Sequence, residues 1–241
     1  MQGIRITPDN WTFFQWGPVS LNATIVFTWG IMLLLVLGSW LVTRRLSAET
    51  SLSRWQNLME VLVSGMREQV REISGRDPGQ YLPFVGTLFI FVAVSNLLGI
   101  VPGYEPPTGS LSTTAALAAC VFVAVPLFGI AQKGLSYFGQ YIKPSVFMLP
   151  FNIMGELSRT LALAVRLFGN VMSGSMIAAI LLAIAPLIFP ILMQALGLLT
   201  GLIQAYIFAI LAMVYIAAAT RVQHPQGQAD QQEEKGDLSD G

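Results

Sequence analysis

The chain has 241 residues, of which 54% are hydrophobic and only 11% are charged. Because a soluble globular protein carries about 25% charged residues, this composition excludes the soluble class and indicates an integral membrane protein. The formal net charge of zero gives no indication of nucleic-acid binding. One cysteine, Cys120, excludes an internal disulfide, and one histidine, His224, lies in a polar stretch. We therefore expect no metal site and no cofactor.

Five apolar segments are long enough to span or enter a membrane, since a helical span needs about 20 apolar residues. The fourth and fifth form one long apolar stretch, which Pro186 and Pro190 are expected to divide into a helical hairpin because proline removes a backbone donor. The fold class predicted is all-α. The expected spans are residues 21–42, 81–101, 111–131, 151–185 and 190–219.

Three further segments lie outside the predicted spans. Residues 1–20 are polar and aromatic, do not resemble a secretory signal, and are predicted to lie outside the cell. Residues 52–74 place apolar side chains such as Leu58 and Val70 on one side at helical spacing, which predicts an amphipathic helix on the membrane surface. Residues 220–241 are polar and acidic without periodicity, and are predicted to be a disordered cytoplasmic tail.

The distribution of Lys and Arg predicts the orientation in the membrane. The loop GYEPPTGS between the second and third spans contains none, and only Arg5 precedes the first span. We therefore expect the N-terminus outside and the C-terminus in the cytoplasm. The positive residues assigned to the cytoplasmic side are Arg44, Arg45, Arg54, Arg67, Arg71, Arg76, Lys133, Lys143, Arg221 and Lys235.

Arg166 lies well inside the apolar stretch from Phe151 to Thr220. Arginine stays protonated, and its presence at bilayer depth costs about 2.5–3.5 kcal/mol on insertion scales. The only acid in that stretch is Glu156, ten residues earlier. We expect another protein to supply the counter-charge of Arg166. The alternatives are a pair with Glu156 or an extended side chain that reaches a lipid headgroup.

Residues on the same helical face as Arg166 are predicted to meet a neighbouring helix at short range, because several of them are small. We call these residues the Arg166 face. Arg159 lies nearer the start of the helix. Its side chain either meets the neighbouring helix with the rest of this face or extends to the lipid headgroups. Glu156 either lines an ion path or pairs with Arg159. The members of the Arg166 face are Arg159, Ala162, Arg166, Gly169, Asn170 and Ser173.

Polar residues on the second arm of the hairpin also require partners. Gln204 lies deep in an apolar helix, where an unpaired amide costs several kcal/mol. Either Arg166 on the facing arm or an ordinary interhelical hydrogen bond, worth about 1 kcal/mol, would satisfy it. Gln194 precedes it on the same arm.

These segments closely resemble subunit a of the rotary F-type ATP synthases. The resemblance rests on RLFGN at 166–170, QAYIF at 204–208, and SNLLGIVPG followed by PPTGSLSTTAALA, and it covers nearly the whole chain up to Ala219. It implies a non-catalytic, ion-translocating subunit of a bacterial plasma-membrane complex. Its implied partners are a ring of c subunits, the peripheral-stalk b subunits, the ATP-hydrolysing head and the lipid bilayer.

The resemblance also implies roles for individual residues. Arg166 would be the stator arginine that faces the carboxylates of the c ring. Asn170 and Gln204 would line or support the ion path between two aqueous half-channels, and the hairpin would lie tilted against the ring. ATP chemistry is expected elsewhere in the complex, because the chain contains no GxxxxGK[ST] phosphate-binding loop.

The chain departs from many proton-coupled relatives after RLFGN. Ser175 stands where an acid is often found, and Gly197 stands on the facing arm. The remaining polar groups, Ser173, Ser175 and Gln194, do not titrate near neutral pH but can bind sodium or hold a file of water. This pattern suggests the proposed sodium-pumping N-type branch, although ion choice depends mostly on the c subunit.

Two other function classes are weighed against this interpretation. A stand-alone ion channel or ion-coupled transporter would also retain an intramembrane arginine, but the internal repeat typical of such transporters is missing. An intramembrane enzyme would need a nucleophile–base pair or metal ligands. The predicted spans contain no histidine and no paired acids.

Overall fold

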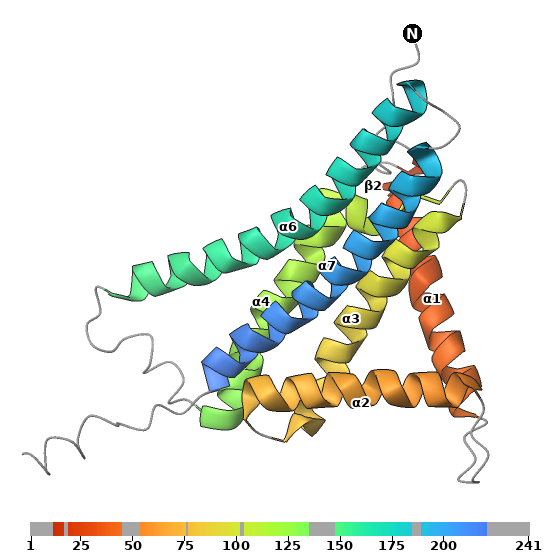
Figure 1. Cartoon of the computed structure of the whole chain (residues 1–241). Helices are drawn as coiled ribbons and strands as arrows, with labels where there is room; N and C mark the ends of the chain where they lie inside the picture. The colour runs from red at the N-terminus through yellow and green to blue at the C-terminus, as the bar shows by residue number, and fades with distance from the viewer. Residues whose placement is uncertain are drawn as a thin grey trace, which may run out of the picture.

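The computed structural model describes residues 12–16, 19–44, 54–75, 77–101, 104–134, 148–184 and 189–220 (Figure 1). The predicted tail, the residues before Thr12 and the turn at Pro186 lie outside the described residues. Five of the described helices are long and apolar enough to cross a membrane, as expected. The helices are α1 (Ala23–Thr43), α2 (Arg54–Ser74), α3 (Leu82–Leu97), α4 (Leu111–Lys133), α6 (Met148–Ile184) and α7 (Phe189–Thr220).

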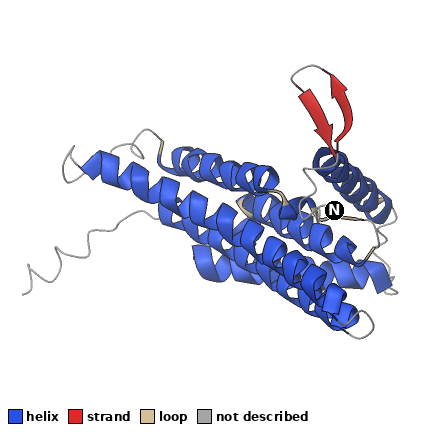
Figure 2. Cartoon of the chain, turned by 90° about the horizontal axis from the view of Figure 1, so that it is seen from above, coloured by secondary structure: helices blue, strands red, loops and turns tan. Residues whose placement is uncertain are grey.

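A short β-hairpin precedes α1 and was not predicted. β1 (Thr12–Trp16) pairs antiparallel with β2 (Val19–Asn22) (Figure 2). The available sequence signal was the Gly17–Pro18 dipeptide, which often marks a turn, after the aromatic segment TFFQW. The prediction of an all-α fold therefore holds for the five apolar helices and α2, while the described N-terminal residues form strands.

The apolar core lies where α3, α4 and α6 pack around α7. Small and large apolar side chains of α7, including Ala205, Phe208 and Ala212, are fully buried in a cluster that also contains Val92 of α3 and Leu167 of α6. Small residues allow such helices to approach closely in lipid. Figure 1 shows that α6 and α7 run in opposite directions, adjacent at one end of the molecule and separated at the other. The last two helices thus form the long hairpin predicted from the sequence.

The amphipathic helix α2 crosses the lower ends of α1 and α3 (Figure 1). Its residue Val70 is buried, whereas Arg67, Glu68 and Arg71 are exposed. The Tyr206 hydroxyl of α7 donates a hydrogen bond of 2.8 Å to Gln69 Oε1 of α2. The helix is therefore joined to the spanning helices by both apolar and polar contacts.

A 3₁₀ turn, η4 (Pro107–Gly109), lies between α3 and α4 and is completely buried. It packs against α1, α3, α4 and α6. A Cβ atom added at Gly109 would lie 3.2 Å from Val171 Cγ1 of α6, so the glycine permits a close approach. The sequence indicated a loop here, but not one that enters the helix bundle.

Candidate functional site

Arg166 lies on the exposed side of α6. Leu163, Ala164 and Leu167 of the same helix are buried, so the packing of these three residues turns Arg166 away from the core. Val165 beside it is 58% exposed. Within the described part of the chain, Arg166 forms no hydrogen bond and no salt bridge. The alternative in which Glu156 neutralises Arg166 is therefore not the arrangement found.

The carboxylate of Glu156 is instead paired with Arg159. Arg159 Nη1 lies 3.3 Å from Glu156 Oε2, one helical turn away on α6. The guanidinium carbon of Arg159 also lies 5.9 Å from the centre of the Tyr215 ring on α7, within the range of a cation–π interaction. Of the two alternatives left open for Glu156, the pair with Arg159 is the contact that the structure contains.

The polar residues that follow Arg166 have different surroundings. Asn170 is partly buried, and its Nδ2 donates to the backbone oxygen of Thr200 on α7 at 3.4 Å. The hydroxyls of Ser173 and Ser175 are exposed and donate to carbonyls of their own helix, at 3.2 and 2.9 Å. Asn170 therefore joins the two arms of the hairpin, whereas the two serines lie on the outer surface of α6.

Gln204 is buried in α7, with only 6% of its surface exposed. Its Nε2 has no hydrogen-bond partner among the described residues. Of the two alternatives for Gln204, the hydrogen bond from Arg166 is not formed, because Arg166 lies on the exposed side of α6, and Nε2 has no interhelical partner among the described residues either. Gln194, nearer the start of α7, is exposed and donates from Nε2 to the backbone oxygen of Gly99 at 3.0 Å.

A buried polar network close to Asn170 was not identified from the sequence. Asn96 of α3 donates from Nδ2 to the backbone oxygen of Gly201 at 3.0 Å, and Thr108 of η4 donates from Oγ1 to Asn96 Oδ1 at 2.9 Å. Thr108 and Asn96 are 0% and 7% exposed. An asparagine inside an apolar run was the available signal, because a buried amide needs partners. Its partner, 105 residues away, could not be inferred.

The segment between η3 (Leu98–Ile100) and η4 holds two titratable groups outside the candidate spans. Tyr104 donates from its hydroxyl to the backbone oxygen of Ser95 at 3.1 Å, and its ring meets Phe27 edge to face. Burial raises the pKa of Tyr104 above its usual value. Burial also raises the pKa of the Glu105 carboxyl. The carboxyl thus retains its proton to a higher pH than in a fully hydrated position.

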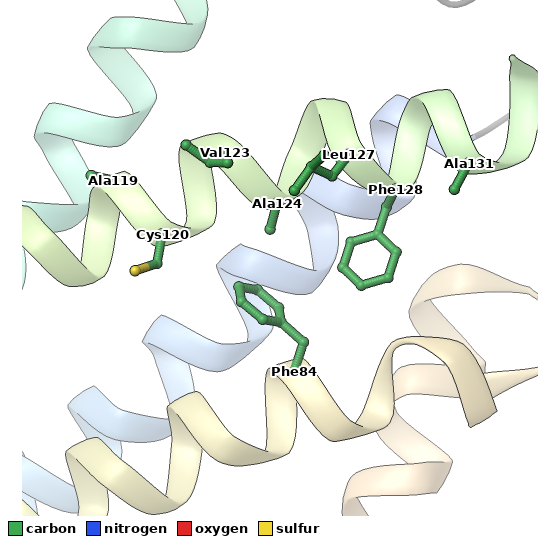
Figure 3. Close-up of a pocket in the computed structure, with 8 residues that line it drawn as sticks. All are labelled: Phe84, Ala119, Cys120, Val123, Ala124, Leu127, Phe128 and Ala131. Atoms are coloured by element: carbon green, nitrogen blue, oxygen red, sulfur yellow. The ribbon is translucent and has the colours of Figure 1, made fainter. Parts of the chain in front are cut away.

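A separate apolar cavity of about 700 Å³ opens between α3 and α4 (Figure 3). The rings of Phe84 on α3 and Phe128 on α4 point toward one another there, and Cys120 of α4 also lines the cavity (Figure 3). Its lining contains no charged side chain, so this cavity is unsuited to binding an ion. Among the described residues there is also no group of three or more His, Cys, Asp or Glu side chains that could hold a metal.

Five helices long and apolar enough to cross a membrane define an integral membrane protein, and an arginine within such a helix is typical of a protein that translocates ions. A family model described as the ATP synthase A chain matches residues 25–217. The chain belongs to this family, subunit a of the F-type ATP synthases, which is the stator ion-channel subunit of the F0 membrane sector. The resemblance inferred from RLFGN and QAYIF is confirmed.

Several bacterial proteins are similar over most of their length. "ATP synthase subunit a 2" of Acaryochloris marina is 62% identical over 234 residues, which are 97% of this chain and 100% of the relative. "ATP synthase subunit a" of Albidiferax ferrireducens is 62% identical over 224 residues, 92% of this chain and 97% of the relative. The protein of the same name from Nitrosospira multiformis is 60% identical over 218 residues, 90% of this chain and 87% of the relative.

Proposed function

We propose that Arg166 is the stator cation of this subunit and that the exposed side of α6 around it meets a ring of c subunits, each carrying one carboxylate. One observation supports this proposal most strongly. Arg166 is exposed on an otherwise largely apolar helix and, among the described residues, has no counter-charge. A permanent cation at bilayer depth is costly without a partner. A carboxylate presented by a neighbouring protein would remove that cost.

The mechanism follows from the charge of Arg166. A ring carboxylate that carries its ion is neutral and can rotate through lipid. When it comes within about 4–6 Å of Arg166, the cation favours the ionised acid, so the bound ion is released. The same charge blocks a direct passage of ions between the two half-channels. Ions therefore cross only by travelling with the ring, and each charge moved supplies about 2.3 kcal/mol per 100 mV for torque.

The other polar residues of the hairpin support or line the ion path in this proposal. Asn170 follows Arg166 by one turn on α6, and Gln204 lies on the facing helix α7. Ser173, Ser175 and Gln194 are exposed along the same two arms. Glu156 and Arg159 lie further toward the start of α6. We propose that the N-terminus lies outside the cell and residues 220–241 lie in the cytoplasm, and the distribution of Lys and Arg supports this orientation. Peripheral-stalk b subunits and the ATP-hydrolysing head complete the assembly.

The proposal is tested with Arg166→Ala in the complete complex. ATP-driven ion transport into membrane vesicles should be lost, while subunit a remains assembled with the ring. The matched control is Arg159→Ala, since Arg159 lies on the same helix but is already paired with Glu156. This control should retain most transport. Normal coupled transport in assembled Arg166→Ala complexes would overturn the proposal.

We further propose that the coupling ion is sodium. The support is chemical: Ser173, Ser175 and Gln194 offer oxygen ligands, and they have no titratable group to relay protons near neutral pH. The test is ATP-driven uptake of labelled sodium into vesicles in the presence of a protonophore. Uptake that persists or rises supports direct sodium transport. Uptake that collapses shows that protons are pumped and that sodium movement is secondary.

A further inference from the structure

Helix α7 receives hydrogen bonds from two other helices at two consecutive backbone oxygens. Asn170 of α6 donates to Thr200 O at 3.4 Å, and Asn96 of α3 donates to Gly201 O at 3.0 Å. Residues 200 and 201 lie in the middle of α7, not at a frayed end. The two amides therefore define the position of one turn of α7 relative to both neighbours.

The orientation of the Asn96 amide is itself determined by Thr108. Thr108 Oγ1 donates to Asn96 Oδ1 at 2.9 Å, so the amide oxygen is an acceptor and the amide nitrogen is directed to Gly201. All three residues are buried. In an environment from which water is excluded, such a network is strongly directional, because a rotated amide would leave a donor and an acceptor unpaired.

Gly201 makes this approach sterically possible. A Cβ atom added at residue 201 would lie 2.8 Å from Asn96 Cβ, closer than side chains can approach. One turn earlier on α7, a Cβ atom at Gly197 would meet nothing within 4 Å. The two glycines thus have different roles, and only Gly201 is required for contact between α3 and α7.

These contacts lie about one helical turn from Arg166 on α6 and from Gln204 on α7, the two residues to which the proposed function assigns roles in ion transfer. Arg166 precedes Asn170 by four residues on α6, and Gln204 follows Gly201 by three residues on α7. Because the two helices run in opposite directions (Figure 1), both steps lead toward the same end of the molecule. At a rise of about 1.5 Å per residue, Arg166 and Gln204 lie about 6 and 4.5 Å along their helices from the hydrogen-bonded turn.

We propose that Asn96 is a positioning residue for ion transfer, acting through Gly201 to fix the height and rotation of α7, and hence of Gln204, relative to Arg166. The Asn170–Thr200 hydrogen bond fixes the same turn from the side of α6. This inference rests on the proposed role of Arg166. Asn96 itself does not touch the reacting carboxylate. Its effect is geometric, because displacements of about 1 Å in a reaction site can lower rates by large factors.

The test uses Asn96→Leu in the complete complex, with Ser95→Ala as the matched control. Leucine has a similar volume but removes both interelement hydrogen bonds. Ser95 is also buried in α3, but its hydroxyl donates to Phe91 O of its own helix and not to another element. The quantity measured is the number of ions transported per ATP hydrolysed, in membranes with equal amounts of assembled complex. We expect about a tenfold fall for Asn96→Leu and no change for Ser95→Ala.

A merely structural role would give a different result. Fewer complexes would assemble, but those present would transport a normal number of ions per ATP, and this outcome overturns the inference. If Asn96→Leu fails to assemble, Thr108→Val carries the test, because it keeps the shape and removes the hydroxyl that orients Asn96. About a fivefold fall that Thr108→Ser reverses supports the inference. A normal ratio in Thr108→Val overturns it.

Failure of this inference is distinguishable from failure of the proposed function. If Arg166→Ala abolishes transport while Asn96→Leu keeps a normal ratio, only the positioning role of Asn96 is wrong. If Arg166→Ala complexes transport ions normally, the proposed role of Arg166 is wrong whatever Asn96→Leu shows.

Discussion

Arg159 Nη1 lies 3.3 Å from Glu156 Oε2, so one of the two arginines of α6 is neutralised within its own helix. Arg166, two turns later, has no such partner among the described residues. The two guanidinium groups are chemically the same, so their different partners determine their different roles. A paired arginine contributes to local structure, whereas an exposed, unpaired one at bilayer depth is available to a second protein.

Glu156→Gln should therefore change coupled transport by no more than about threefold. The Arg159 side chain is 55% exposed, and ion pairs of this kind contribute at most about 1 kcal/mol. The double variant Glu156→Gln with Arg159→Ala should be no worse than the more affected single variant, since both changes remove one interaction. ATP-driven transport into vesicles measures all three. A complete loss in Glu156→Gln would place this carboxylate in the ion path itself.

Gln204→Leu should affect the stability of the complex and the coupling of ion transport to ATP hydrolysis in different ways. The Nε2 group of Gln204 has no partner among the described residues, and an unsatisfied buried amide costs about 1–3 kcal/mol. Leucine removes that cost, so the heat resistance of the assembled complex should rise or stay the same. Ion transport per ATP should fall, but less than in Arg166→Ala. If Gln204→Leu abolishes transport as completely, the amide has a primary role and does not merely support Arg166.

Gly201→Ala and Gly197→Ala form a matched pair on α7. Alanine at 201 would overlap Asn96, and such overpacking costs about 1–3 kcal/mol. Alanine at 197 meets no atom and favours the helix by up to about 1 kcal/mol. Heating of detergent-solubilised complexes, followed by detection of released subunit a, compares the two. Equal heat resistance would show that α3 and α7 are not packed as closely as the 2.8 Å distance from Asn96 at residue 201 requires.

Glu105→Gln should remove a pH dependence of stability. Burial raises the pKa of Glu105 in the folded chain, so the folded state holds this proton more tightly than the unfolded state. Stability is then greatest below the unfolded pKa and declines as pH rises through the folded pKa. Above that range the glutamine variant should release subunit a at a higher temperature than the wild type, and at acid pH the two should agree. A constant difference at all pH values would exclude this cause.

The sequence predicted the elements whose signal is local. Apolar length identified the five candidate spans, charge periodicity identified α2, and two prolines located the break between α6 and α7, where Pro190 falls in the first turn of α7. Proline is tolerated there because the first backbone donors have no helical partner. The β-hairpin before α1 has only a weak local signal, because its strands are short and polar residues surround their aromatic ones.

The candidate site could be predicted only in part. Its position inside an apolar stretch and the motif RLFGN identified Arg166, and α6 places it on its exposed side. Glu156 pairs with Arg159 three residues later on the same helix, a local contact that the sequence offered as one of two alternatives. Whether Gln204 would find a partner depended on packing between helices. The bond from Asn96 to Gly201 joins residues 105 positions apart. No local pattern encodes such a pairing, because it is determined by the depth at which α3 and α7 meet.

The most direct test of the central claim is disulfide cross-linking between the Arg166 face and the c ring. Ala162→Cys places a thiol one turn from Arg166, and it is paired with cysteines introduced beside the ring carboxylate. The native Cys120 is exposed on α4 and provides an internal control. The account predicts a cross-link from residue 162 that stops ATP-driven rotation until it is reduced, with none from Cys120. A ring that cross-links to Cys120 but not to residue 162 would contradict the account.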